Sequence, residues 1–240
     1  MNYIRGGVFL DYTKEEFERM LNLIADDYVL VRSKFELYCK MTEVSDLHNE
    51  LMSEISPGFF TLVFDALISD IFINLTKLID HKDEAVGTIY TLILDSNNSK
   101  DLFRHKNRIT EIYKARHQRE LRRQGKVLSK VQYIRNKKFA HLDPIYQLDR
   151  QKIIEDKFIS FNDLREVFVV LHRVLNHYHQ AFFGRKLDPF AKNATDVIKL
   201  MEAMAYYKQG YIRETNVNLL AAGLMPSKTG RISMDDLEEV

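Results

Sequence analysis

The chain contains few of the glycine and proline residues that form the turns of a β-sheet protein. It has nine glycines and four prolines in 240 residues, whereas an architecture of short strands requires turn signals roughly every 8–12 residues. Hydrophobic residues make up 45% of the chain, and a core of that size needs no disulfide or metal to stabilise it. We therefore expect an all-α protein.

Two helix-start signals locate the first long elements. Thr13 and Glu16 form an S/T-x-x-E capping box, and apolar residues then recur at three- and four-residue steps. Ser56-Pro57 opens a second helix, with serine as N-cap and proline in the first turn, where its missing N–H costs nothing. The apolar run behind it predicts a helix that ends at about Ile79.

Similar signals place the remaining elements. A shorter helix is expected from Asp83 to about Leu94, followed by a polar break at residues 95–99. The sequence Ser-Phe-Asn-Asp at 160–163 opens another strong helix that should end near Gly184. A last helix is expected from Ala194 to about Lys208.

The longest apolar stretch, residues 59–79, raises the question of a membrane span. Four polar or charged residues interrupt it, and a spanning helix of about 20 residues carries few or no charges. These residues are Asp65, Asp70, Asn74 and Lys77. We therefore expect a buried core helix and no membrane association. The single cysteine, Cys39, and the absence of a secretory signal at the N-terminus favour a reducing, cytoplasmic location.

Charge is distributed very unevenly along the chain. Residues 100–141 contain fourteen basic and three acidic residues, about +11, while the whole chain is +1. Gly125 should split this segment into two helices, and Pro144 should end the second. The segment either binds RNA phosphates or pairs with the acidic remainder of the chain, and the sequence leaves both open. The RNA-binding interpretation selects Arg116, Arg119, Arg122, Arg123, Lys126, Lys130, Lys137 and Lys138.

The end of this basic segment combines a cation, an amide and an imidazole, in Arg135, Asn136 and His141. Cleavage of RNA without a metal needs a group that takes the 2′-hydroxyl proton and a fixed cation on the phosphate. Histidine titrates near neutrality and suits the first role, and the rigid arginine fork suits the second. Asn136 could orient either of them. No phosphate-binding glycine loop, cysteine cluster or HExxH pattern is present, so no cofactor or metal is expected.

The pattern Arg-Asn-x4-His follows the aromatic-aliphatic pair Tyr133-Ile134 and closes a basic helix. It resembles the R-φ-x3–5-H signature of HEPN domains. Within that class the chain is most similar to the abortive-infection U-type (AbiU2-like) branch, in which Arg-Asn-Lys and a terminal Ala-His recur. Residues 75–80 (LTKLID) also resemble the L-x-x-L-x-D sequence of that branch. The resemblance covers roughly residues 15–185.

This resemblance implies a single antiparallel bundle of long helices that dimerises and acts as a metal-independent endoribonuclease leaving a 2′,3′-cyclic phosphate. Many such domains are toxins or phage-defence effectors, so an antitoxin or sensor is a plausible partner. Arg135 and His141 would be the catalytic pair, with Asn136 beside them. The implied organisation is an N-terminal extension at 1–12, the HEPN-like domain at 13–185, and a C-terminal helix and tail at 186–240. One departure is that no tyrosine stands two places after His141, so regulation by modification at that position is not expected.

Helix geometry adds a condition to the catalytic hypothesis. Residues six apart on a straight α-helix lie about 240° around its axis and about 9 Å along it. Arg135 and His141 of one chain would therefore not face each other. Two copies related by a two-fold axis can bring the arginine of one chain near the histidine of the other, so the catalytic interpretation predicts a homodimer.

Less specific interpretations stay open beside this one. His141 could simply cap the helix at the core edge, Arg135 could be an ordinary solvated or ion-paired arginine, and Asn136 could merely hydrogen-bond locally. The chain could then be a binding module that holds RNA or a nucleotide without cutting, or a helical adaptor. The aromatic residues of the basic segment fall at helical spacing and are expected in the core rather than on a base-stacking surface. They are Phe103, Tyr113 and Tyr133. His172, His177 and His179 lack metal-ligand spacing and are expected to be structural.

Overall fold

The structure is a computed structural model. It describes residues 12–43, 52–53, 57–80, 87–137 and 159–188, the backbone of 138–140, and several positions between 196 and 207. Its elements are α1 (Lys14–Thr42), α3 (Pro57–Ile79), α4 (Ile89–Asn98), the short 3-10 helices η1 (Lys100–Leu102) and η2 (Lys106–Arg108), α5 (Glu111–Arg123), α6 (Gly125–Ile134), the π-helical turn η3 (Arg135–Ala140) and α9 (Phe161–Phe183). No strand occurs in the described ranges, which confirms the all-α prediction.

The chain divides into two compact units. The larger contains Met1–Cys39 and Leu62–Ala194, and the smaller contains Lys40–Thr61 and Thr195–Val240. In the smaller unit Met41, Met52 and Phe60 are buried. Its described positions between 196 and 207 are helical, in agreement with the helix expected there. The domain boundaries expected at residues 12 and 185 stay predictions.

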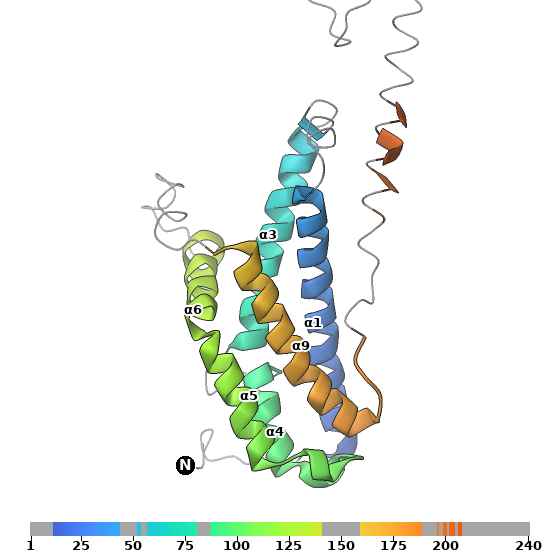
Figure 1. Ribbon diagram of the computed structural model, residues 1–240, viewed down its shortest axis with the longest axis vertical. Helices are drawn as coiled ribbons and strands as arrows, with labels where there is room; N and C mark the ends of the chain where they lie inside the picture. The colour runs from blue at the N-terminus through green and yellow to red at the C-terminus, as the bar shows by residue number, and fades with distance from the viewer. Residues whose placement is uncertain are drawn as a thin grey trace, which may run out of the picture. The chain divides into compact units, whose positions relative to one another are not determined.

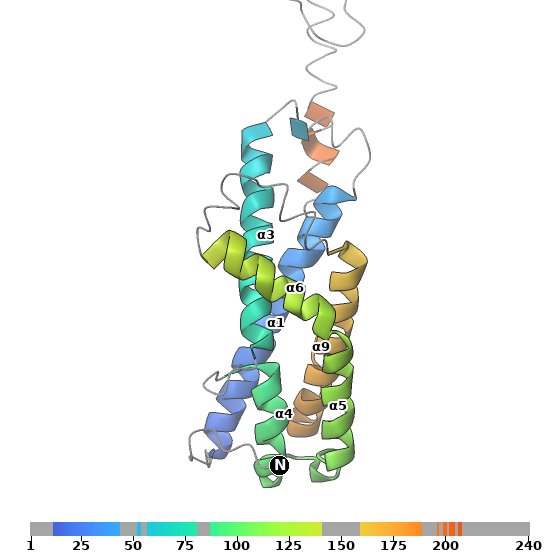
Figure 2. The same cartoon turned by 90° about the vertical axis from the view of Figure 1, so that its left-hand side faces the viewer.

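The core of the larger unit is an aromatic seam between α1 and α9. Phe17 stacks on Phe182 with ring centroids 5.5 Å apart, and Phe35 stacks on Phe168 at 4.9 Å. The hydroxyl of Tyr28 donates to the backbone carbonyl of Phe168 at 3.2 Å, so the most buried tyrosine of α1 keeps a hydrogen bond. In the two views α3 and α9 run alongside α1 (Figure 1, Figure 2).

Capping boxes open both helices of this seam, as the sequence predicts. The Glu16 carboxylate accepts from the Thr13 backbone N–H at 2.8 Å, and the Glu16 N–H donates to the Thr13 hydroxyl at 3.2 Å. Ser160 and Asp163 form the same reciprocal pair before α9. Gly184 ends α9 in the left-handed conformation, with φ of 76°. These caps satisfy backbone donors and carbonyls that a helix end leaves free.

α3 begins at Pro57 and ends at Ile79, as predicted, but its burial is uneven. It is long and apolar enough to cross a membrane by length and composition, and 22% of its most apolar window is buried. The buried side chains of its second half extend from Ile71 to Ile79, whereas Leu62 in the first half is 71% exposed. The expectation of a buried core helix therefore holds only for the second half.

α4 corrects two predictions. It begins at Ile89 rather than at Asp83, because Gly87 (φ 75°) turns the chain and Thr88 caps the helix in a box with Thr91. It also continues through residues 95–98, where a polar break was expected. The Ser96 hydroxyl donates to the Leu92 carbonyl at 2.6 Å, and the Asp95 carboxylate accepts from Tyr12, 83 residues away, at 3.0 Å. The polar residues are therefore satisfied inside the helix.

The basic segment forms two short 3-10 helices and then a broken helix. Thr110 caps the start of α5, and its hydroxyl accepts from the Tyr113 N–H at 3.3 Å. α5 ends at Arg123, and α6 begins at Gly125, which confirms the break predicted there. α5 packs on α4 and α9, and α6 packs on α9 (Figure 1). Pro144, expected to end the second helix, lies outside the described residues.

Candidate functional site

We call α5, α6 and η3 together, Glu111–Ala140, the basic arm. η3, the last element of the arm, begins at the sequence motif. Arg135 is both the C-cap of α6 and the first residue of η3. The Arg135 N–H donates to the carbonyls of Val131 and Gln132. A π-helical turn pairs residues five apart, and such turns are rare and frequent at functional sites. The regular helix therefore changes its geometry where the motif starts.

The Arg135 side chain is held by its neighbour in sequence. Its Nη1 donates to Oδ1 of Asn136 at 2.9 Å. Its Nε is buried and has no hydrogen-bond partner in the structure. Asn136 itself is exposed, while Ile134 on the other side is 9% exposed and packs in the core. The two predicted residues are thus brought together, with the amide fixing one end of the guanidinium.

His141 lies outside the described residues, one position beyond the end of η3. The side chain of Lys138 also lies outside them. The geometry of the predicted pair, Arg135 with His141, therefore stays a prediction.

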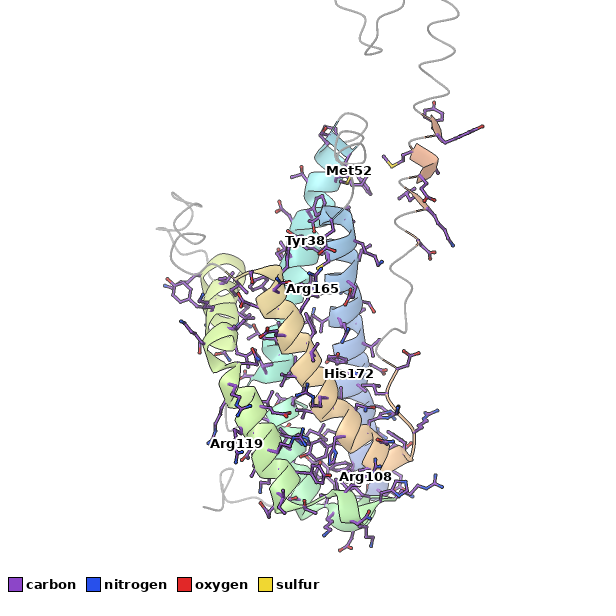
Figure 3. The ribbon with its side chains drawn as sticks, in the orientation of Figure 1. Tyr38, Met52, Arg108, Arg119, Arg165 and His172 are labelled. Atoms are coloured by element: carbon purple, nitrogen blue, oxygen red, sulfur yellow. The ribbon has the colours of Figure 1, made fainter. Side chains whose placement is uncertain are left out.

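The other predicted RNA-binding residues differ in exposure. Five are exposed: Arg116, Arg119, Arg122, Arg123 and Lys126. Lys130 and Lys137 are half-buried. The exposed arginines surround α5 and do not form one stripe: Arg116 contacts Glu120 on the side of α9, whereas Arg122 lies near Tyr90 of α4. Burial raises the pKa of Tyr90, and the charge of Arg122 opposes that shift. Figure 3 shows Arg119 on α5 and Arg108 nearer the end of α9.

Ion pairs bear on whether the basic segment is neutralised by the rest of the chain. Lys106 pairs with Asp101 at 2.9 Å, Lys114 with Glu111 at 3.5 Å and Arg116 with Glu120 at 3.2 Å. These three acidic residues all belong to the segment itself. They are far fewer than its fourteen basic residues, and Lys130 acts on Asp163 of α9. Within the segment itself positive charge is therefore in excess.

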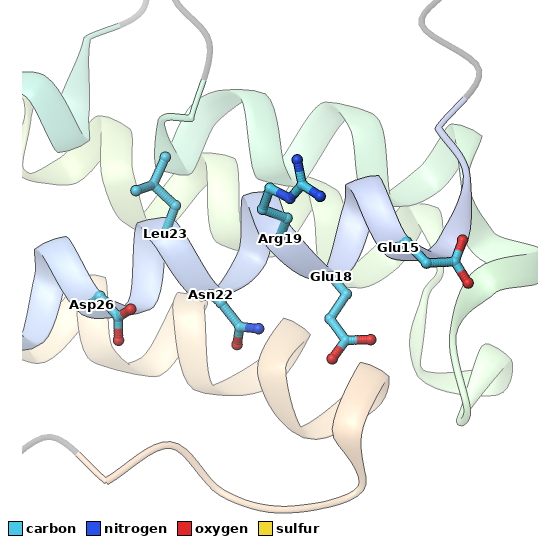
Figure 4. A pocket seen from close by; sticks show the side chains of 6 residues that line it. All are labelled: Glu15, Glu18, Arg19, Asn22, Leu23 and Asp26. Carbon is cyan, nitrogen blue, oxygen red and sulfur yellow. The ribbon is translucent and has the colours of Figure 1, made fainter.

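The hollow in Figure 4 lies on the outer side of α1 and has a volume of about 530 Å³. Three of its six lining residues are acidic, and none belongs to the motif. The residues are Glu15, Glu18, Arg19, Asn22, Leu23 and Asp26. Three carboxylates repel phosphate, so this hollow is unsuited to RNA.

A cluster of rings between α5 and α9 was not anticipated. Tyr113, expected in the core, is 39% exposed and lies against His177 with ring centroids 4.5 Å apart. Phe103, also expected in the core, is 2% exposed and confirms its prediction. The Tyr113 prediction is wrong because this ring contacts α9 through His177 but keeps part of its surface in solvent, and the neighbouring Ile112 is 80% exposed as well. Helical spacing alone gives no signal of that exposure.

The histidines of α9 make structural contacts, as expected. Nε2 of His177 donates to the Arg108 carbonyl at 3.0 Å, and Nδ1 of His179 lies 3.0 Å from the Arg185 carbonyl. His172 stacks on Tyr28 with centroids 5.9 Å apart. Burial, the largest cause, lowers the pKa of each of these three imidazoles. Among the described residues, no three His, Cys, Asp or Glu side chains are grouped as metal ligands.

The larger unit is helical throughout its described ranges, and its basic arm carries Arg135-Asn136 where α6 gives way to η3. The sequence model of the HEPN AbiU2 family, described as AbiU2, matches residues 14–200. The match covers more than half of the chain, and the chain therefore belongs to the HEPN AbiU2 family of abortive-infection-related domains. No curated protein and no solved structure matches the chain.

Proposed function

We propose that this protein is a cytoplasmic, metal-independent endoribonuclease that acts as a toxin or effector in abortive infection. The observation that carries the proposal is the Arg135 guanidinium, fixed by Asn136 at 2.9 Å where the basic arm changes to a π-helical turn. In this reaction His141 transfers protons at the 2′-hydroxyl and at the leaving oxygen. Arg135 stabilises the negative charge that develops on the non-bridging phosphate oxygens, and Asn136 positions Arg135.

The proposal includes a homodimer. η3 is a π-helical turn, so the α-helical angle between positions six apart does not apply to it unchanged. Arg135 and His141 are still six residues apart in the sequence, and we do not expect them to form a complete site within one chain. A two-fold axis that brings two motifs together supplies each site with the arginine of one chain and the histidine of the other. An antitoxin or a sensor of infection is the further partner that this role calls for, since an unrestrained ribonuclease would harm its own cell.

Expression in bacterial cells tests the proposal. Wild type, His141→Ala and His105→Ala are induced to the same soluble level while growth and total RNA integrity are followed. His105 is an exposed histidine upstream of the basic arm and serves as the matched control. We expect growth arrest and fragmented RNA with wild type and with His105→Ala only. Intact RNA in all three cultures would contradict the proposal.

The excess positive charge of the basic segment also favours a second candidate, a module that binds RNA or a nucleotide without cutting it. Binding by such a module survives His141→Ala and weakens steeply with salt, because it depends on phosphate contacts. Cleavage by wild type that is lost in His141→Ala separates the first candidate from the second.

A further inference from the structure

A column of aromatic rings reaches the surface between α5 and α9. Tyr113 lies against His177 with centroids 4.5 Å apart and an interplanar angle of 33°. His177 in turn contacts His117 and Tyr178 at centroid distances of 4.8 and 5.2 Å. His117 and Tyr178 are 3% and 2% exposed, whereas Tyr113 is 39% exposed. The exposed ring of Tyr113 is therefore packed against rings that belong to the buried core.

Three arginines from three elements lie beside the column, next to His177 and His117. Arg108 of η2 accepts a hydrogen bond from His177 through its carbonyl, and the charges of Arg108 and Arg116 both act on His177. Arg116 of α5 and Arg173 of α9 contact the same Glu120 oxygen at 3.2 and 3.3 Å. Their side chains stay 59% and 51% exposed. Glu120 thus holds two guanidinium groups in place without removing them from solvent.

We call Tyr113, His177, Arg108, Arg116 and Arg173 the ring patch. An exposed aromatic ring offers a face on which a nucleic-acid base stacks, and arginines beside it hold the phosphates on either side of that base. An acidic peptide would use the arginines but has no need of the ring. The combination of one exposed ring with three cations and one shared carboxylate therefore favours a single-stranded nucleic acid.

We propose that the ring patch binds single-stranded RNA, with a base stacked on Tyr113 and the flanking phosphates held by Arg108, Arg116 and Arg173. The proposal rests on the proposed function in one respect, that RNA is the substrate. Tyr113 lies in the first turn of α5 and Arg135 follows the end of α6. The two are at most about 33 Å apart, the length of an unbroken helix of 22 residues at 1.5 Å per residue, and the break at Gly125 shortens that distance. The patch is therefore a second RNA contact separate from the motif, which secures long strands.

RNA binding by the full-length chain carrying His141→Ala tests the proposal without cleavage. The probe is a fluorescein-labelled oligouridylate of about 16 nucleotides, long enough for an extended groove. Its anisotropy is followed for Tyr113→Leu, Tyr113→Phe and Arg173→Ala in this background. Tyr206→Leu and Arg19→Ala are the matched controls, since Tyr206 is 81% exposed and Arg19 lies in the acidic hollow of α1. Thermal unfolding confirms that each variant is folded.

We expect Tyr113→Leu to weaken binding roughly 5- to 100-fold, as loss of one base stack does, and Tyr113→Phe to retain it. Arg173→Ala should lower the slope of log K against log salt by about 0.7, the loss of one phosphate contact. Equal affinities for Tyr113→Leu and Tyr206→Leu would overturn the ring patch while leaving His141-dependent cleavage intact. Absence of binding in the parent His141→Ala chain would also overturn it. So would a competition in which heparin displaces the oligouridylate equally well from the parent chain and from the Tyr113→Leu variant.

Discussion

The α1–α9 seam and the basic arm are both helical, but they differ in what their side chains do. In the seam, stacked rings such as Phe35 and Phe168 are almost fully buried and pack on each other. In the arm, arginines surround α5 in solvent and the helix ends in a π-helical turn. Buried packing in the seam stabilises the fold. The exposed positive charges of the arm do not stabilise it, so their concentration there points to a role in binding.

The largest expected effect lies in the arm. Arg135→Ala should lower the rate of RNA cleavage by a factor of about 10² or more, because a fixed cation on the phosphate is lost. Arg135→Lys should recover only part of this, since lysine lacks the planar fork that Asn136 holds. Cleavage rates of the purified proteins on a labelled single-stranded RNA measure both. A cleavage rate for Arg135→Ala equal to that of the control Arg19→Ala would show that Arg135 takes no part in catalysis.

The largest expected loss of stability lies in the seam. Phe168→Ala should lower the free energy of unfolding by about 3–5 kcal/mol, because it leaves a cavity between α1 and α9. Arg119→Ala, on the exposed side of the arm, should change it by less than about 0.5 kcal/mol. Urea unfolding of the two variants measures the contrast. Similar losses for both would erase the distinction between the two regions.

Acid should lower the free energy of unfolding by protonating His117, a buried histidine of α5 that packs against α9. Burial, and then the neighbouring His177, lower the pKa of His117 to about 4, against about 6.5 in the unfolded chain. The neutral imidazole therefore contributes fully above pH 6.5, and about 3 kcal/mol is lost as the pH falls to 4. Unfolding free energies at pH 7.5 and 4.5 should differ less in His117→Gln than in wild type. An identical pH dependence would show that folding does not lower the pKa of His117.

The smallest effect is at the start of α9. Ser160→Ala should lower the free energy of unfolding by about 1 kcal/mol, because the capping box with Asp163 is lost. Thermal unfolding measures it, and Asn162→Ala at an exposed position of the same turn is the control. Equal unfolding temperatures for the two variants would mean that the cap adds nothing to the seam.

Sequence predicted the elements whose signals are local. The capping boxes at Thr13 and Ser160, the start at Pro57 and the break at Gly125 all concern residues a few positions apart. The sequence also predicted Arg135 and Asn136 as site residues, and the structure brings them into contact.

The predictions that failed depend on contacts between distant residues. α4 retains its polar end because Tyr12 reaches Asp95 across 83 residues, which no local rule anticipates. Exposure of Tyr113 depends on how much of its ring the distant residue His177 covers, and the π-helical turn at the motif has no marker in composition. Periodicity states which residues share a helix face, but it does not state which face the neighbouring helix covers.

Mixing two inactive chains tests the central claim most directly, that one chain's Arg135 acts with the partner's His141. Arg135→Ala and His141→Ala proteins are purified, partly unfolded together, refolded and assayed on single-stranded RNA in the presence of a chelator. Random pairing makes half of the dimers mixed, and each mixed dimer has one complete site of two. The account predicts about a quarter of wild-type cleavage from the mixture and none from either variant alone. Absence of cleavage in the mixture, with dimers present and wild type active, would contradict the shared site.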